Sequence, residues 1–368
     1  MRNKLLLFAI SFFTIQALNA QLTTAVQGGS TKATVAERVG VTDITIHYDR
    51  PAVNGREGKI WNGIVHKGFS DLQFGTSKSA PWRAGANENT TFTFSTDVKI
   101  EGQPLKAGTY GFFMAMGDQD ATLIFSKNHS SWGSYFYDPK EDALRVNVKT
   151  APINESVERL KYEFMNQTPS GTVIALIWEK LKVPFKVEVD LVQTQMQSFR
   201  EELRSDKGFR WESWVEAAEF AVQNNTNLDE ALEWSNYSIN SSFPGQKNFK
   251  TLSTKAMILD KMGKKAEADV LMKDAMPMAN MNELHQYGRK LLTEKRSREA
   301  LEVFIMNDKK NPNNFTTSMG LVRGYSANGD YKNALKYANS ASAIAPNKNS
   351  KDLVAGMIVK LEAGKDVN

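Results

Sequence analysis

Hydrophobic and polar residues alternate along much of the chain between about residues 32 and 190. The alternation is clearest at 44–48, 91–95 and 145–148. A period of two predicts antiparallel strands with one buried face. Residues 172–178, TVIALIW, are almost wholly apolar and predict a central strand covered on both sides. About eight to ten short strands are typical of a sandwich or a barrel, and we expect an antiparallel β-sandwich.

The segment 50–89 interrupts this pattern with many glycines and prolines and little periodicity. Loops of this length are usually functional or disordered. This one contains Trp61, Phe69, Phe74 and Trp82, and disordered segments have few aromatic residues. We therefore expect an ordered loop that packs over the sheet.

After Asp190 the hydrophobic period becomes helical, and from Trp211 the sequence repeats. Prolines mark the repeat, with intervals of 33 to 35 residues between Pro244, Pro277, Pro312 and Pro346. A period near 34 residues is typical of stacked helical hairpins, which usually bind another protein or a peptide.

The repeats resemble the tetratricopeptide pattern of small residues, a tyrosine or leucine, a turn glycine and a final proline. The last repeat carries this pattern at Tyr325, Gly329, Ala334, Ala341 and Pro346. The third repeat has Lys295 and Arg296 where the turn glycine is expected. The resemblance implies about four hairpins whose concave face binds a protein or peptide partner.

The N-terminus reads MRNKLLLFAISFFTIQALNA, with a basic start, an apolar stretch and a small residue at Ala20. This order is typical of a cleaved secretory signal. The sequence contains no cysteine, which excludes a disulfide framework and thiol chemistry. We expect an exported protein of a Gram-negative cell envelope, periplasmic or extracellular. The predicted parts are a signal peptide at 1–20, a β-sandwich at 21–190, a helical connector at 191–210 and the repeats at 211–368.

Charge and motifs exclude several functions. The formal net charge of +5 includes Arg2 and Lys4, so the mature chain is near +3, with both signs interspersed. A nucleic-acid partner would need a basic face, and none is predicted. The mature chain has no apolar stretch long enough for a transmembrane span. The four histidines lack metal-site spacing, and neither a nucleotide-binding loop nor a serine-nucleophile motif occurs. We expect no cofactor and no metal, and we favour a protein without enzymatic activity.

Four blocks of polar and aromatic residues occupy the strand region: HYDRPAVNGR at 47–56, PWRAGANENTTFTFSTDV at 81–98, LKAGTY at 105–110 and WGSYFYDPKEDALRV at 132–146. In this order they resemble the secreted bacterial family known as domain of unknown function 2911, over roughly residues 25–190. The family has no established activity, so the resemblance implies a domain boundary and a cell-envelope setting but no mechanism. Between Ile64 and Trp82 this chain has a longer connection than the family pattern.

These blocks supply the candidate ligand-binding residues, which combine forked guanidinium groups, acids and flat aromatic rings. They are Tyr48, Asp49, Arg50, Arg56, Trp82, Arg83, Asn87, Glu88, Trp132, Tyr135, Tyr137, Asp138 and Arg145. Arginine pairs with two acceptors and an aromatic ring stacks on a sugar, so the set suits a small polar ligand such as a sugar or an anionic peptide end. The alternative is structural: residues of these types also close turns and anchor loops.

We therefore predict an exported interaction or scaffold protein, whose repeats bind a protein or peptide and whose β domain holds a small polar ligand. A first alternative is an envelope hydrolase or carbohydrate-active enzyme that uses Glu88 or Asp138 with Arg83 or Arg145. A second alternative is a purely structural sandwich in a chain that is an assembly subunit.

Overall fold

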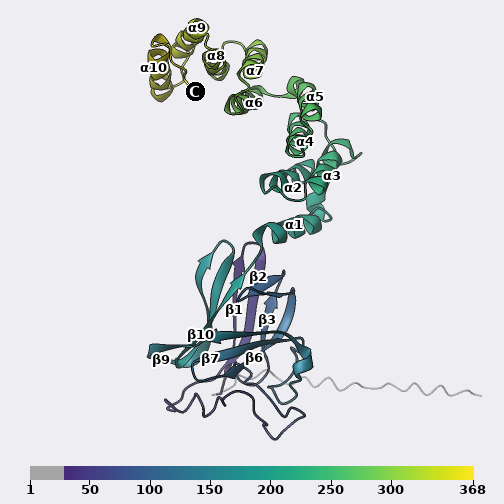
Figure 1. The fold of residues 1–368 in the computed structure, drawn as a ribbon, viewed down its shortest axis with the longest axis vertical. Helices are drawn as coiled ribbons and strands as arrows, with labels where there is room; N and C mark the ends of the chain where they lie inside the picture. The colour runs from purple at the N-terminus through teal and green to yellow at the C-terminus, as the bar shows by residue number, and fades with distance from the viewer. Residues whose placement is uncertain (1–28) are drawn as a thin grey trace, which may run out of the picture. The chain divides into compact units, whose positions relative to one another are not determined.

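The computed structural model describes residues 29–368, so the predicted signal peptide at 1–20 lies outside the described residues. The chain divides into two compact units between Leu191 and Val192, each described here by itself (Figure 1). The mixed fold predicted from the sequence is confirmed: antiparallel β-sheets form the first unit and helices form the second.

The β unit consists of two antiparallel sheets. The larger has six strands in the order β1-β2-β3-β6-β7-β8, and the smaller has four in the order β5-β4-β10-β9. The strands are β1 (Thr31–Val39), β2 (Thr42–Arg50), β3 (Thr90–Phe94), β4 (Val98–Ile100), β5 (Gln103–Leu105), β6 (Gly108–Met116), β7 (Asp120–Ser126), β8 (Asp142–Lys149), β9 (Ala151–Thr168) and β10 (Gly171–Glu188).

The core of the β unit lies between the two sheets. Along β2 the even-numbered residues from 42 to 48 are buried, because alternate side chains of a strand point to opposite faces. Phe112 of β6 stacks on Phe185 of β10 with ring centroids 5.9 Å apart, which joins the two sheets. Strand β10 lies between β4 and β9 and is buried along 174–178, so the prediction of a central strand there is confirmed.

The segment between β2 and β3 is an ordered loop, as predicted. Trp82 pairs with Met114 of β6 through backbone hydrogen bonds of 2.8 and 2.9 Å. Its indole stacks on that of Trp178, with centroids 6.1 Å apart. The aromatic residues of the loop differ in burial, because Trp61 and Trp82 pack on the core while Phe69 and Phe74 remain exposed.

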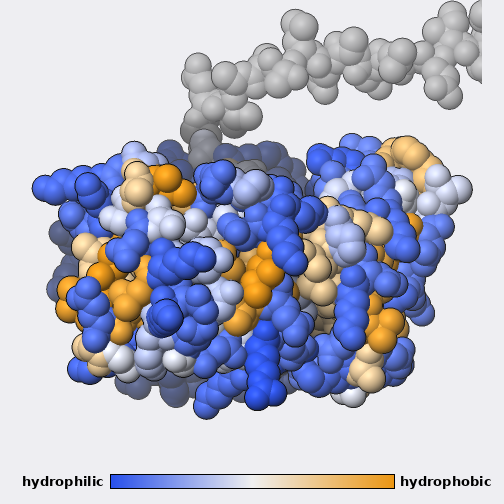
Figure 2. Space-filling view, turned by 90° about the horizontal axis from the view of Figure 1, so that it is seen from above, coloured by the Kyte–Doolittle hydropathy of each residue, from blue (hydrophilic) through white to orange (hydrophobic). Residues whose placement is uncertain are grey.

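The helical unit consists of α1, four hairpins and a final helix. The helices are α1 (Leu191–Glu202), α2 (Trp211–Gln223), α3 (Leu228–Asn240), α4 (Phe249–Lys261), α5 (Lys265–Ala275), α6 (Met281–Thr293), α7 (Ser297–Lys310), α8 (Phe315–Ala327), α9 (Tyr331–Ala343) and α10 (Lys348–Glu362). Between residues 29 and 368, no helix has the length and apolar character needed to cross a bilayer. The face drawn in Figure 2 is mostly hydrophilic, with apolar residues in narrow patches.

Each hairpin ends at one of the four phased prolines. Pro244, Pro277, Pro312 and Pro346 lie just beyond the ends of α3, α5, α7 and α9. Proline lacks a backbone N–H and clashes with the preceding turn, so it cannot continue a helix. An asparagine then caps the next helix: the side chains of Asn248, Asn280, Asn314 and Asn347 accept hydrogen bonds from backbone N–H groups of α4, α6, α8 and α10.

The hairpins α6–α7 and α8–α9 meet around one large buried ring. Phe304 of α7 is fully buried, and it packs against Gly288 of α6 and against Gly320 and Gly324 of α8. Without side chains at these glycines, the three helices approach closely around the ring. This packing fixes α6, whose other side borders the cavity described below.

Candidate functional site

Three of the predicted residues in the β unit form a partly exposed cluster. The rings of Trp132 and Tyr135 are nearly parallel, with an angle of 11° and centroids 6.0 Å apart. The guanidinium carbon of Arg83 lies 5.1 Å from the Trp132 centroid and 5.3 Å from that of Tyr135. Arg83 also donates a hydrogen bond of 2.8 Å to the carbonyl oxygen of Asn87. We call Arg83, Trp132 and Tyr135 the aromatic platform.

Two predicted acids lie beside this platform. The backbone of Glu88 pairs with that of Trp132 in an isolated bridge. The Glu88 carboxylate lies 3.0 Å from the Lys32 ammonium, and a hydrogen bond from Lys32 lowers the pKa of Glu88. The same ammonium lies 3.9 Å from Asp49, whose pKa is raised because its carboxylate is buried. Lys32 was not among the predicted residues, since nothing in its local sequence distinguishes it from other surface lysines.

Two other predicted residues form a second cluster around Asp142. The Tyr137 hydroxyl donates to the Asp142 carboxylate at 2.8 Å, and Arg145 donates to the same carboxylate at 2.5 Å. Arg145 also donates to the Tyr137 oxygen at 2.6 Å. Burial raises the pKa of both Tyr137 and Asp142. The cluster ties the segment before β8 to the sheet, and the guanidinium lies over the ring of Phe69.

The remaining predicted residues serve the backbone or the core. The Tyr48 hydroxyl accepts a 3.3 Å bond from the backbone N–H of Tyr162, and Trp82 is buried among other indoles. Arg50 donates to the carbonyl oxygen of Leu160, and Arg56 donates to those of Ala52 and Val53. Asp138 caps a short 3-10 turn at Pro139–Glu141. The contacts of these five residues are structural ones.

The two acids considered for a hydrolase are therefore held differently. Glu88 pairs with Lys32 at the platform, whereas Asp138 caps a turn near the second cluster. Across residues 29–368, no group of three or more histidine, aspartate or glutamate side chains is arranged to hold a metal ion.

A cavity of about 420 Å³ opens in the helical unit between α4 and α6, with Glu219 of α2 and residues of α5 on its border. Its apolar wall is formed by Phe249, Ala256, Met257, Ala268, Met272 and Tyr287. Its polar rim is formed by Glu219, Lys250, Asp260, Asp269, Glu283, Lys290, Glu294 and Arg296. Burial raises the pKa of Tyr287 to about 12, so this phenol stays neutral.

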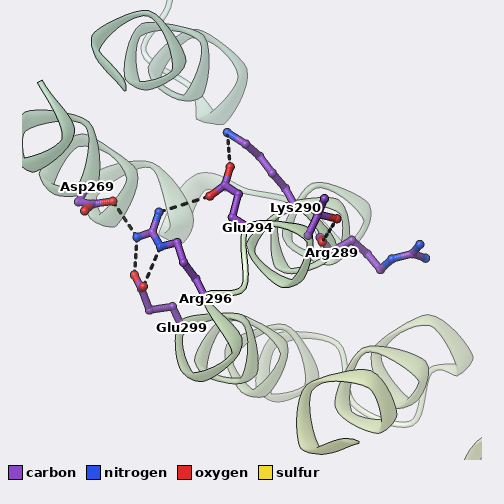
Figure 3. A network of polar contacts seen from close by, with 7 residues as sticks. Asp269, Arg289, Lys290, Glu294, Arg296 and Glu299 are labelled. Atoms are coloured by element: carbon purple, nitrogen blue, oxygen red, sulfur yellow. Dashed lines mark hydrogen bonds and ion pairs between the residues drawn. The ribbon is translucent and has the colours of Figure 1, made fainter. Parts of the chain in front are cut away.

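Ion pairs fix the rim of the cavity at the turn between α6 and α7 (Figure 3). Arg296 lies 2.8 Å from Asp269 of α5 and 2.5 Å from Glu299 of α7. It also lies 3.6 Å from Glu294, which itself lies 3.5 Å from Lys290. The carboxylates of Glu299 and Asp269 raise the pKa of Arg296 further, so it remains a cation. In Figure 3 the guanidinium of Arg289 points away from this network.

At the opposite side of the cavity, Glu219 of α2 is held to α4. It accepts hydrogen bonds from Lys250 at 2.5 Å and from the Thr254 hydroxyl at 2.8 Å. The rim is thus made of paired charges on both sides of an apolar wall. The arrangement suits an apolar side chain on a polar backbone, and it carries no group with the geometry of a nucleophile and base.

Sequence reasoning did not find this cavity. Its wall combines residues from α4, α5 and α6 whose side chains look like ordinary helix packing. The one local signal was the absence of a turn glycine in the third repeat. Lys295 occupies that position with a φ of 60°, the left-handed conformation that Gly263 and Gly329 adopt in the neighbouring repeats, and Arg296 follows it in the ion-pair network.

Comparison with known proteins gives two kinds of match. Residues 30–187 match the model of a family described as a protein of unknown function, DUF2911, which confirms the resemblance drawn from the four blocks. No curated protein matches the chain.

Solved structures that are similar to part of the chain include the following three. YrrB, described as a TPR protein with an unusual peptide-binding site, has 16% identity and a TM-score of 0.30, over 45% of this chain and 84% of that one. The C-terminal part of a TPR repeat-containing protein from Cytophaga hutchinsonii has 14% identity and a TM-score of 0.35, over 47% and 66%. A structure described as MamA MSR-1 C2 has 12% identity and a TM-score of 0.27, over 42% and 95%.

Proposed function

We propose that the helical unit binds an extended segment of a partner protein across α2, α4 and α6, with an apolar side chain of that segment in the cavity. The observation that carries the proposal is the 420 Å³ cavity with an apolar wall and a rim of paired charges. Stacked hairpins of this kind usually expose a binding surface formed by several repeats.

The size of the cavity supports a large apolar side chain as its occupant. An apolar cavity of about 150 Å³ in another protein already admits benzene. Burying a leucine or phenylalanine side chain contributes about 1.5–3 kcal/mol, which is about 10- to 100-fold in affinity. One anchor of this kind is enough to make recognition measurable, while the rim excludes water around it.

The rim favours a segment with polar groups beside its anchor. Lys250 and Arg296 are already paired with acids, so a partner charge would have to displace an existing ion pair. Backbone amides and hydroxyls bind such a rim without that cost. Asp260, also on the rim, is exposed and offers a carboxylate to such donors.

We also propose that this binding takes place in the cell envelope, on the basis of the signal-like pattern at residues 1–20. Fractionation of cells that express the full chain with a C-terminal epitope tag tests this point. The tagged protein should be released with the periplasmic or extracellular fraction and should be shorter than the full chain by about 20 residues. Full-length protein in the cytoplasmic fraction would contradict it.

A peptide-library selection on the full chain tests the binding function. Two variants separate the cavity from the rest of the surface. Ser253→Trp places an indole at the cavity wall, where Ser253 is partly exposed and bonds only to the carbonyl of its own helix at Lys250. Val359→Trp, on α10, is the matched control because Val359 is 66% exposed and lies outside the cavity.

Peptides selected on the wild type should share one large apolar residue. Their affinity, measured by fluorescence anisotropy, should fall at least about tenfold for Ser253→Trp and stay unchanged for Val359→Trp. The circular dichroism spectra of both variants should match that of the wild type. Peptides that bind Ser253→Trp as tightly as the wild type would exclude the cavity, and a selection without enrichment would refute the function.

A further inference from the structure

We propose that the β unit has a second binding site, in which the aromatic platform binds a neutral oligosaccharide. The platform consists of Arg83, Trp132 and Tyr135, and the polar groups beside it are Lys32, Asp49 and Glu88. This site is independent of the cavity in the helical unit and takes a different class of ligand.

The platform exposes flat aromatic surface to solvent. The Trp132 side chain is 55% exposed although its backbone is fixed by the bridge to Glu88. Phe74 and Phe136 extend the surface, with the Phe74 ring 5.1 Å from that of Tyr135 and 6.2 Å from that of Phe136. Both phenylalanines are at least half exposed. Exposed rings that lie together in one region indicate a binding surface, because single exposed residues are common whereas clusters are not.

The platform is held rigid before any ligand arrives. Arg83 is fixed by its hydrogen bond to the Asn87 carbonyl and by the two rings against which it lies. Gly133 has a φ of 70°, which favours glycine, and a Cβ there would lie 2.7 Å from the guanidinium carbon of Arg83, so another residue would displace the guanidinium from this position. Tyr135 is fixed from the other side, because its carbonyl accepts a 2.9 Å bond from the backbone of Ser77. Rigid rings lose little entropy on binding.

Hydrogen-bonding groups of both kinds lie near Trp132, whose backbone pairs with that of Glu88. The Glu88 carboxylate lies 3.0 Å from the Lys32 ammonium, and the same ammonium lies 3.9 Å from Asp49. Asp49 is only 4% exposed, whereas the side chains of Lys32 and Glu88 are mostly exposed, so Lys32 and Glu88 are the groups of this set that a ligand on the rings can reach.

These features together favour a neutral sugar over other ligands. The faces of sugar rings carry C–H groups that pack on aromatic rings, and their edges carry hydroxyls that both donate and accept. The two carboxylates offset the charges of Lys32 and Arg83, so the site has no net positive charge that would favour an anionic ligand such as a phosphate or an acidic peptide. The two phenylalanines extend the surface beyond one ring, which indicates a chain of several sugar units.

Isothermal titration of the full chain with cellohexaose, xylohexaose and chitohexaose tests the proposal. At least one of these neutral probes should bind the wild type. Trp132→Ala should weaken that binding at least about tenfold, and Trp132→Phe, which keeps an aromatic ring, should weaken it less. Glu88→Gln keeps the shape of the side chain and should weaken binding by a smaller factor.

Phe209→Ala is the matched control, because Phe209 is an exposed aromatic residue of the helical unit. It should leave the affinity unchanged. Failure of all three probes to bind at millimolar concentration would overturn the proposal, as would equal affinities for the wild type and Trp132→Ala. It would also be overturned if Trp132→Ala lost binding to the peptides selected on the full chain, since the platform would then be a protein-binding surface.

Discussion

The packing of Phe304 gives a quantitative test of how the helical unit is held together. Its ring is 1% exposed and lies between α6 and α8. A Cβ built at Gly320 or Gly324 would lie 2.6 or 2.9 Å from the ring, and one at Gly288 would overlap it. The ring therefore fills a space that three glycines leave open.

Two substitutions perturb this packing in opposite ways. Phe304→Ala removes the ring and leaves a cavity, which should lower the free energy of unfolding by about 3–5 kcal/mol. Gly288→Ala adds a methyl group that overlaps the ring. Because this methyl group would lie closer to the ring than Cβ atoms do in real structures, the overlap costs about 2–3 kcal/mol, the upper part of the usual range for overpacking. About 1 kcal/mol of better helix propensity offsets part of it, so a net loss of about 1–2 kcal/mol is expected.

Urea unfolding followed by circular dichroism at 222 nm measures these losses, since the signal at this wavelength comes mainly from the helices. Phe209→Ala, at a residue 66% exposed, is the control and should change stability by less than about 0.5 kcal/mol. Gly288→Ala combined with Phe304→Leu should cost less than the sum of the single changes, because the smaller side chain makes room for the methyl group. A loss below about 1 kcal/mol for Phe304→Ala, or a Gly288→Ala variant as stable as the wild type, would refute this reasoning.

Three further predictions concern charge and backbone conformation. Arg296→Met should lower the free energy of unfolding by about 1–2 kcal/mol at pH 7. Its partner Glu299 has a pKa below the ordinary value of 4.5, so this loss of stability should be complete above pH 4.5 and should shrink as the pH falls below it. Urea titrations from pH 7 to 3 would show this change. Lys295→Gly should raise the melting temperature, since a φ of 60° costs a lysine about 1 kcal/mol that glycine avoids, and an unchanged or lower value would contradict this. Asp49→Asn should stabilise the β unit by about 1 kcal/mol at pH 7, because burial raises the pKa of Asp49 and the charged carboxylate therefore destabilises the wild type. Below the ordinary pKa of 3.8 the wild-type carboxyl is protonated, and the stability advantage of the variant should disappear. An advantage that grows as the pH falls would be inconsistent with a buried charge.

The elements were predictable from the sequence because their signals are local. Alternation marks β2 and β3, in which the even-numbered residues at 42–48 and 90–94 are buried. The phased prolines mark the end of the second helix in each hairpin. A further local signal was present but unused. An asparagine caps the helix after each proline, at Asn248, Asn280, Asn314 and Asn347, so the starts of the helices were readable as well.

The sites were less predictable because they depend on contacts between distant segments. Candidate residues in the β unit were chosen for their chemistry, but a guanidinium can equally well bind a backbone carbonyl, as Arg50 and Arg56 do. Lys32 meets Glu88 only because the loop before β3 folds back to the start of β1. The cavity in the helical unit is formed by α4, α5 and α6 together, and no single repeat contains it.

The central claim is that the cavity between α4 and α6 receives an apolar side chain of a partner, and site-specific photocrosslinking tests it most directly. A diazirine amino acid close to methionine in volume, which leaves the cavity open, is placed either at Met257, on the cavity wall, or at Val359, on α10. With a peptide selected on the full chain, crosslinks should form from position 257 to the apolar anchor of the peptide and be absent from position 359. Equal crosslinking at the two positions, or none at 257 with a peptide that still binds, would contradict the account.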